Sequence, residues 1–158
     1  MNKKTVVAVG MAAGLALAMG ACGGGVDGGS DVSLVEWTSS FGFCPPAAYC
    51  TTRLRVTGTE AVVTLESREA PALRNSVRLD AASADALARA ASRARFDGLG
   101  PVIGCPDCAD GGAETLSVTA GGQQHSVTFE FNAMVDQLEP ALGQVRGLAA
   151  RLRPNPSR

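Results

Sequence analysis

Residues 114–131, ETLSVTAGGQQHSVTFEF, carry the clearest structural pattern in this chain of 158 residues. Apolar and polar residues alternate over residues 116–120 and again over 127–131, on the two sides of a Gly121-Gly122 pair. Alternation with a period of two is typical of a strand with one buried side, and two adjacent glycines suit a two-residue hairpin turn. The stretch therefore predicts an antiparallel β-hairpin.

One helix is predicted before this hairpin and another after it. The first is capped by Asp80 or Ser83 and runs to about Arg95, because leucine and alanine recur there with helical spacing. A glycine and a proline shortly afterwards are typical of a helix end. The second runs from about Gln137 to Leu152, with its leucines on one side and a proline in its first turn.

Four further strand candidates precede the first helix, at residues 32–37, 52–56, 63–65 and 77–79. Strands and helices do not alternate singly, as they would in a parallel sheet, and this order is typical of an α+β domain. We therefore expect one α+β domain over residues 32–153, followed by a short tail at 154–158. The expected architecture is one antiparallel sheet of about five to six strands with two helices packed on one face.

The first 22 residues have the layout of a bacterial secretory signal peptide. Two lysines precede an uncharged apolar run at 6–19, which is shorter than the roughly 20 residues that a membrane-spanning helix needs. The small pair Gly20-Ala21 directly before Cys22 resembles the lipobox of bacterial lipoproteins, whose cysteine becomes the lipidated first residue. We expect a signal peptide at 1–21, a lipid-bearing Cys22 and a glycine-rich tether over 22–31; the alternative is ordinary cleavage nearby.

The expected location is the outer membrane or cell surface rather than the inner membrane. Gly23 stands at the position where some bacteria use an aspartate to retain lipoproteins in the inner membrane. Without the two lysines of the signal peptide, the 14 basic residues fall to 12 arginines, against 15 carboxylates, which is a formal charge of −3. Arginines scattered through a mildly acidic chain do not form a basic surface for phosphate backbones. We expect the lipid to contact the membrane, and we expect no nucleic-acid partner.

Four cysteines remain besides Cys22, namely Cys44, Cys50, Cys105 and Cys108. An even number in an exported chain predicts two disulfides. Three connectivities stay open: local bridges are worth about 2 kcal/mol each, whereas a first bridge joining the two loops is worth about 4 kcal/mol in the chain-entropy model. Self-contained loops favour local pairing slightly.

Two other uses of these cysteines compete with disulfides. A thiol oxidoreductase could use Cys105 and Cys108, but such pairs sit at a helix N-terminus that stabilises the thiolate, and here a strand follows. A structural zinc site usually combines two tight Cys-x-x-Cys pairs, whereas five residues separate Cys44 from Cys50.

No active site can be assembled from the remaining residues. His125 is the only histidine, and at the start of a strand it is expected to be a partly buried or edge residue. Asp107, Asp110 and Glu114 lack the oxygen spacing of a calcium-binding EF-hand and are expected to form a solvated acidic turn. We therefore predict no catalytic residue, no metal and no cofactor, and a protein that is not an enzyme.

Two proline-containing loops are the candidates for binding a partner. The loop at 39–49 contains Phe41 and Phe43, which could anchor a partner if they project from the surface. The loop at 99–112 contains Asp107 and Asp110.

The C-terminal half has a further pattern, made of LDAASADALARAASRARFDGL, a loop with Ala-Asp, the hairpin and a leucine-rich helix. Over Leu79 to Leu152 it resembles the protealysin-inhibitor (emfourin-like) family, small bacterial inhibitors of thermolysin-type metalloproteases. The first half is similar to lipoprotein domains with a Gly-x-Cys-Pro signature, here Gly42-Phe43-Cys44-Pro45. The lipobox-like start and the lack of an assembled active site predict a lipid-anchored binding module of the cell envelope. The resemblance implies, as its most specific form, an inhibitor of a secreted thermolysin-type metalloprotease; another envelope protein is the alternative partner. The alternatives are a thiol-disulfide oxidoreductase and a structural envelope lipoprotein.

Overall fold

The computed structural model describes residues 31–156. The expected signal peptide, the lipidation site Cys22 and the tether up to residue 30 lie outside the described residues. Seven strands, two α-helices and one 3₁₀ turn follow one another along the described chain. They are β1 (Val32–Ser40), β2 (Thr51–Thr57), β3 (Glu60–Glu66), β4 (Leu73–Arg78), α1 (Ala81–Ser92), β5 (Val102–Ile103), η1 (Cys108–Asp110), β6 (Ala113–Ala120), β7 (Gln123–Glu130) and α2 (Glu139–Leu152).

The strands form one mixed sheet in the order β4-β3-β2-β1-β6-β7-β5. Neighbouring strands are antiparallel, except that β5 runs parallel to β7. The prediction of five to six strands in a purely antiparallel sheet was therefore wrong by one short edge strand. Val102 and Ile103 were expected in a loop, because two residues are too few to show a periodic pattern.

The predicted hairpin is confirmed. Ala120 pairs with Gln123, which leaves Gly121 and Gly122 as the two turn residues. Both have positive φ angles, 56° and 78°, as the common two-residue hairpin turn requires and as glycine adopts without steric cost.

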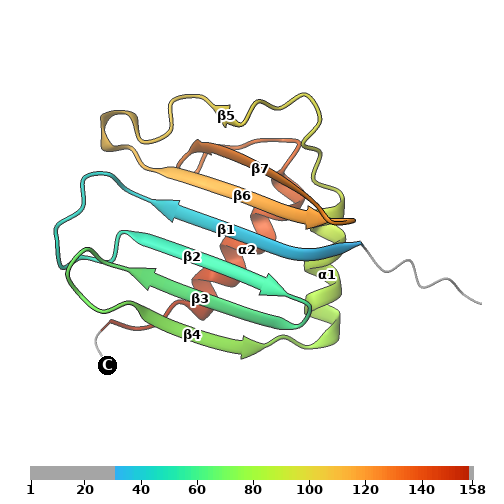
Figure 1. Ribbon diagram of the computed structural model, residues 1–158, viewed down its shortest axis with the longest axis horizontal. Coiled ribbons are helices and arrows are strands. Elements are labelled where there is room, and N and C mark those ends of the chain that lie inside the picture. Colours follow the sequence, from blue (N-terminus) through green and yellow to red (C-terminus); the bar gives the residue numbers. More distant parts are fainter. Residues whose placement is uncertain (1–30, 157–158) are drawn as a thin grey trace, which may run out of the picture.

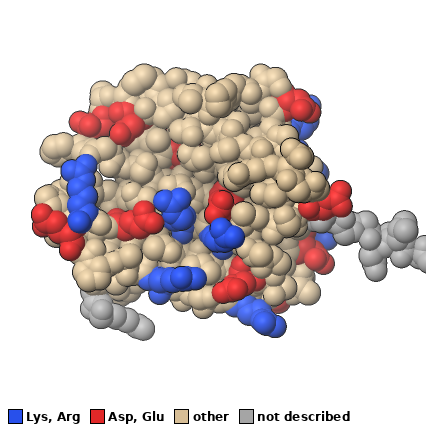
Figure 2. All heavy atoms as spheres, viewed as in Figure 1, with Lys and Arg blue, Asp and Glu red and all other residues tan. Residues whose placement is uncertain are grey.

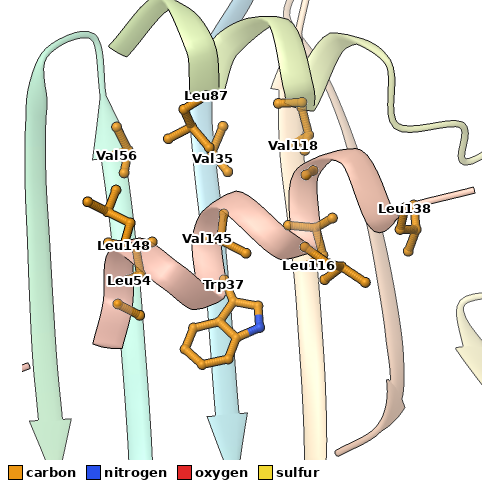
Figure 3. Close-up of a cluster of buried hydrophobic side chains, with 14 of the residues drawn as sticks. Val35, Trp37, Leu54, Val56, Leu87, Leu116, Val118, Leu138, Val145 and Leu148 are labelled. Atoms are coloured by element: carbon orange, nitrogen blue, oxygen red, sulfur yellow. The ribbon is translucent and has the colours of Figure 1, made fainter. Parts of the chain in front are cut away.

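One side of the sheet carries the core. Alternate residues of the five longer central strands are buried in a single cluster, which also contains Leu87 of α1 and Leu142 and Val145 of α2. Figure 3 shows side chains from strands and helices pointing toward one another in this cluster, with Trp37 at one end of the labelled group. Both helices lie behind the sheet in Figure 1.

The helices begin and end close to the predicted residues. Asp80 caps α1 by accepting a hydrogen bond from the Ser83 N–H (2.8 Å). The helix ends at Ser92, three residues before the prediction, because the next two N–H groups bond three residues back in a tighter turn. A tight turn at 135–138 delays the start of α2 to Glu139, two residues after the prediction. Neither helix, nor any other within residues 31–156, is long and apolar enough to cross a membrane.

The opposite side of the sheet faces solvent. Figure 2 shows basic and acidic side chains interspersed over β1 to β4, and mostly uncharged surface over β6 and β7. Two ion pairs link neighbouring strands there, Arg55 with Glu36 at 3.0 Å and Arg53 with Glu66 at 3.4 Å. Charges of both signs are mixed along these strands and do not separate into basic and acidic areas.

Candidate functional site

The two predicted partner-binding loops meet at one end of the sheet, because β1 and β6 are antiparallel neighbours. Ser40, the last residue of β1, pairs with Ala113, the first residue of β6, so the chain leaving β1 lies beside the chain entering β6. We call residues 41–50 and 104–112 the two-loop end. Figure 1 shows it on the left, whereas residue 31 enters β1 on the right.

The two loops are joined by direct contacts. The Gly42 N–H donates a hydrogen bond to Asp107 Oδ1 (2.9 Å), and the Phe41 ring lies against Gly112. Phe41 also packs on Phe131, in the segment after β7, with ring centres 4.7 Å apart. A Cβ at position 42 would collide with the Asp107 carboxylate, so a larger residue there would displace this carboxylate from its present position. Asp107 itself has a φ of 61°, a conformation that aspartate tolerates better than most residues.

A disulfide closes each loop locally. Cys44 is joined to Cys50, with Cα atoms 5.9 Å apart, and Cys105 to Cys108, with Cα atoms 5.4 Å apart. Of the three connectivities that the sequence left open, this is the pairing within each loop. Each loop is therefore constrained on its own, and the contacts between them are non-covalent.

The first loop also rests on the connection between β3 and β4. Ser67 Oγ donates to the Pro46 carbonyl (2.8 Å), and the Tyr49 hydroxyl donates to the Pro71 carbonyl (2.9 Å). Arg68 Nη2 donates to the Gly42 carbonyl (3.2 Å). Together with the hydrogen bond from the Glu69 N–H to the Pro46 carbonyl (3.1 Å), these contacts hold the first loop, which has no regular secondary structure, against the β3–β4 connection.

Of the four residues predicted to contact a partner, Phe43 is the aromatic residue whose ring projects into solvent. Its side chain is 78% exposed. Phe41, which was expected to project, is instead half-buried against Phe131 because its ring fills the space between the loops. Asp107 is exposed but its carboxylate holds Gly42, and Asp110 is exposed beside it in η1.

A cavity of about 310 Å³ lies beneath the two-loop end. Its walls come from the ends of β1, β2 and β6, from the first loop, from the segment after β7 and from the last turns of α2. The lining residues are Trp37, Ser39, Phe41, Tyr49, Cys50, Thr52, Glu114, Phe131, Asn132, Arg146, Ala149, Ala150 and Arg153. Four of the seven aromatic residues of the chain are among them.

The floor of the cavity is a hydrogen-bonded charge network around Glu114, whose side chain is fully buried. Its carboxylate accepts hydrogen bonds from Trp37 Nε1 (2.7 Å), from the Asn132 N–H (2.9 Å) and from Arg146 Nε (2.9 Å). Arg146 also donates to the Ala133 carbonyl (2.9 Å), and its Nη1 lies 3.6 Å from Glu139 Oε1. The buried carboxylate is thus paired and hydrogen-bonded, as burial of a charge requires.

Glu114 was predicted to lie in a solvated acidic turn, and this prediction was wrong. Glu114 belongs to β6 and has the same parity as the buried Leu116 and Val118, so its side chain points to the core side of the sheet. Extending the alternation of buried residues from Leu116 by two residues toward the N-terminus would have predicted a buried side chain at Glu114. Its partner Arg146 could not have been found this way, because 32 residues separate the two in sequence.

His125 lies outside this network. It is exposed near the start of β7, and its ring stacks on Phe96 with ring centres 5.5 Å apart. Within residues 31–156, no three His, Cys, Asp or Glu residues are grouped closely enough to hold a metal ion.

No protein-family model matches this chain, and a search of curated proteins finds no match for it. The function must therefore be inferred from the geometry of the two-loop end and of the cavity beneath it.

Proposed function

We propose that this protein is a non-catalytic binding module of the bacterial cell envelope, anchored through a lipid on Cys22, whose partner-binding surface is the two-loop end. The most specific form of this proposal is inhibition of a secreted thermolysin-type metalloprotease. The observation that carries the proposal is the exposed ring of Phe43. It directly precedes the disulfide-bonded Cys44, in a loop that is hydrogen-bonded to Asp107 and to the connection between β3 and β4.

Rigidity supports this assignment. A loop that is ordered before binding avoids the cost of immobilising its side chains, about 0.5–1.5 kcal/mol for each. Aromatic side chains are frequent among the few residues that dominate binding energy. The substrate cleft of a protease is a concave and mostly apolar site, which suits an exposed phenylalanine on a stiff support.

The position at which the chain enters the sheet also fits an anchored binding module. Residue 31 enters β1 at the end of the sheet opposite the two-loop end (Figure 1), and the nine residues of β1 span about 30 Å. A lipid attached through a tether at that entrance leaves the two loops on the far side of the domain.

The test mixes the chain lacking residues 1–22 with a panel of thermolysin-type proteases at near-stoichiometric ratio and follows peptide cleavage. We expect slower cleavage and a complex on size-exclusion chromatography. Phe43→Ala should weaken inhibition at least about tenfold, as truncation of a dominant interface residue does. Met134→Ala is the matched control, because Met134 is equally exposed at 79% but lies outside both loops.

The disulfide in the first loop gives a second variant. Replacing both Cys44 and Cys50 by serine should weaken inhibition, because the loop must then be ordered on binding, while the remaining core keeps the domain folded. Circular dichroism checks the fold of this variant.

Unchanged cleavage across the panel, with no complex on chromatography, contradicts the inhibitor proposal and leaves an envelope module with another partner. Catalysed reduction of insulin that is lost in Cys105→Ser would instead identify a thiol oxidoreductase.

A further inference from the structure

We propose that the cavity beneath the two-loop end is a binding site for a small organic carboxylate with an apolar, preferably aromatic, body. At about 310 Å³ the cavity lies at the lower end of the range of pockets that hold small ligands. Its rim residues Ala150 and Arg153 are exposed, so the cavity opens to solvent beside the end of α2.

The walls suit the apolar body. Trp37, Phe41, Tyr49 and Phe131 contribute aromatic surface from β1, from both ends of the first loop and from the segment after β7. Aromatic rings pack favourably against one another in offset or edge-to-face arrangements. Trp37 is held by the hydrogen bond from its Nε1 to Glu114, so this wall is positioned before a ligand arrives.

A hydroxyl group also lines the cavity. Ser39 is 7% exposed and belongs to the cavity lining. A serine hydroxyl can donate a hydrogen bond, so it is a candidate contact for an oxygen of the ligand.

The balance of charge favours an anion. Glu114 is neutralised by Arg146 and already accepts three hydrogen bonds, so it offers little to a cationic ligand. Arg153 uses Nη1 to donate to Thr52 Oγ1 (3.2 Å), and among residues 31–156 it has no acidic partner. An arginine with free donors at the rim is suited to a carboxylate, which accepts two parallel hydrogen bonds from a guanidinium group.

The experiment uses the only tryptophan of the chain, Trp37, as the reporter. The purified protein is titrated with 3-phenylpropionate, with the neutral 3-phenylpropanamide and with the cationic 3-phenylpropylamine, following Trp37 fluorescence and the NMR signal of its indole N–H. We expect a saturable change with the carboxylate, at least about tenfold weaker binding of the amide, and the weakest binding for the amine, since hydrogen bonds to charged groups are the stronger ones.

Two variants localise the site. Arg153→Gln should reduce the preference for the carboxylate over the amide about tenfold, whereas Arg151→Gln, on the last turn of α2 but outside the cavity lining, should leave it unchanged. Ser39→Leu should fill the cavity and abolish binding of all three probes, with circular dichroism to check the fold. Phe43→Ala should leave probe binding intact, so this proposal and the proposed function fail independently.

Three results would overturn the proposal. They are the absence of a saturable Trp37 signal with any probe at millimolar concentration, equal affinity for the carboxylate and the amide, and tightest binding of the amine.

Discussion

At the scale of single residues, Glu114 is the strongest departure from what an alternating strand leads one to expect. A charged side chain on the core side of a sheet is stable only if its oxygens are hydrogen-bonded and its charge is balanced. Trp37, Asn132 and Arg146 supply these contacts from three different parts of the chain. The network therefore ties α2 and the segment after β7 to the end of the sheet.

Glu114→Gln tests this network. In the glutamine amide one carboxylate oxygen is replaced by an NH₂ group, which cannot accept the hydrogen bonds that this oxygen accepted. The neutral amide also leaves the partly buried Arg146 without its nearest negative charge. We expect the free energy of unfolding to fall by on the order of 3 kcal/mol, measured by urea denaturation.

Glu36→Gln is the matched control, because Glu36 pairs with Arg55 on the solvent side of the same sheet. Exposed ion pairs are worth less than about 1 kcal/mol, so this variant should be nearly neutral. Equal losses in the two variants would contradict a special role for the buried carboxylate.

At the scale of elements, α1 depends on a single side chain to satisfy its first turn. Asp80 accepts hydrogen bonds from both the backbone N–H and the hydroxyl of Ser83, each at 2.8 Å. The backbone hydrogen bond, followed by the hydroxyl one, lowers the pKa of Asp80 below its ordinary value of 3.8. The ionised form is thus favoured in the folded protein.

This pKa shift predicts a pH-dependent contribution of Asp80 to stability. Because the folded pKa is the lower one, the contribution is fully present above about pH 4, where the unfolded group ionises, and is lost as the pH falls through the folded pKa. Asp80→Asn keeps the capping oxygen but does not titrate. The difference in unfolding midpoint between the wild-type protein and this variant should therefore shrink between pH 6 and pH 3.

Asp85→Asn, on the same helix but away from the cap, is the control for the general effect of acid. A wild-type minus Asp80→Asn difference that stays constant between pH 6 and pH 3 would show that the cap does not depend on the charge of Asp80.

At the scale of the whole molecule, the sheet carries two disulfide-closed loops at one end, and the sequence predicts an export signal before the described residues. The proposed orientation, with the loops away from the membrane, depends on where the chain is anchored. The anchor residue, Cys22, precedes the described residues and is predicted from the sequence pattern alone.

Cys22→Ser should release the protein from the membrane fraction into the soluble fraction, because the lipid is the expected attachment. Fractionation of cells and intact-mass analysis of the extracted protein check this. An unmodified N-terminus at another residue would contradict the anchor.

Much of the local structure follows from the sequence alone. The hairpin, the two helices and four of the other strands were predicted because alternation and helical spacing are local properties, produced by which side of an element faces the core. The short β5 was missed, since two residues pair with β7 only because the chain after α1 is brought alongside it. Helix ends differed by two or three residues, because neighbouring turns decide them.

The sequence by itself determined the strand and helix pattern, the four cysteines that remain besides Cys22, and the resemblance of the first 22 residues to a lipoprotein signal. The patterns among these depend on residues close together along the chain. Only the tertiary structure decided that the two cysteine loops meet, that Phe41 is half-buried while Phe43 is exposed, and that Glu114 faces Arg146 beside a cavity. The physical reason is the antiparallel pairing of β1 with β6, which brings residues more than 60 positions apart into contact and which no local pattern encodes.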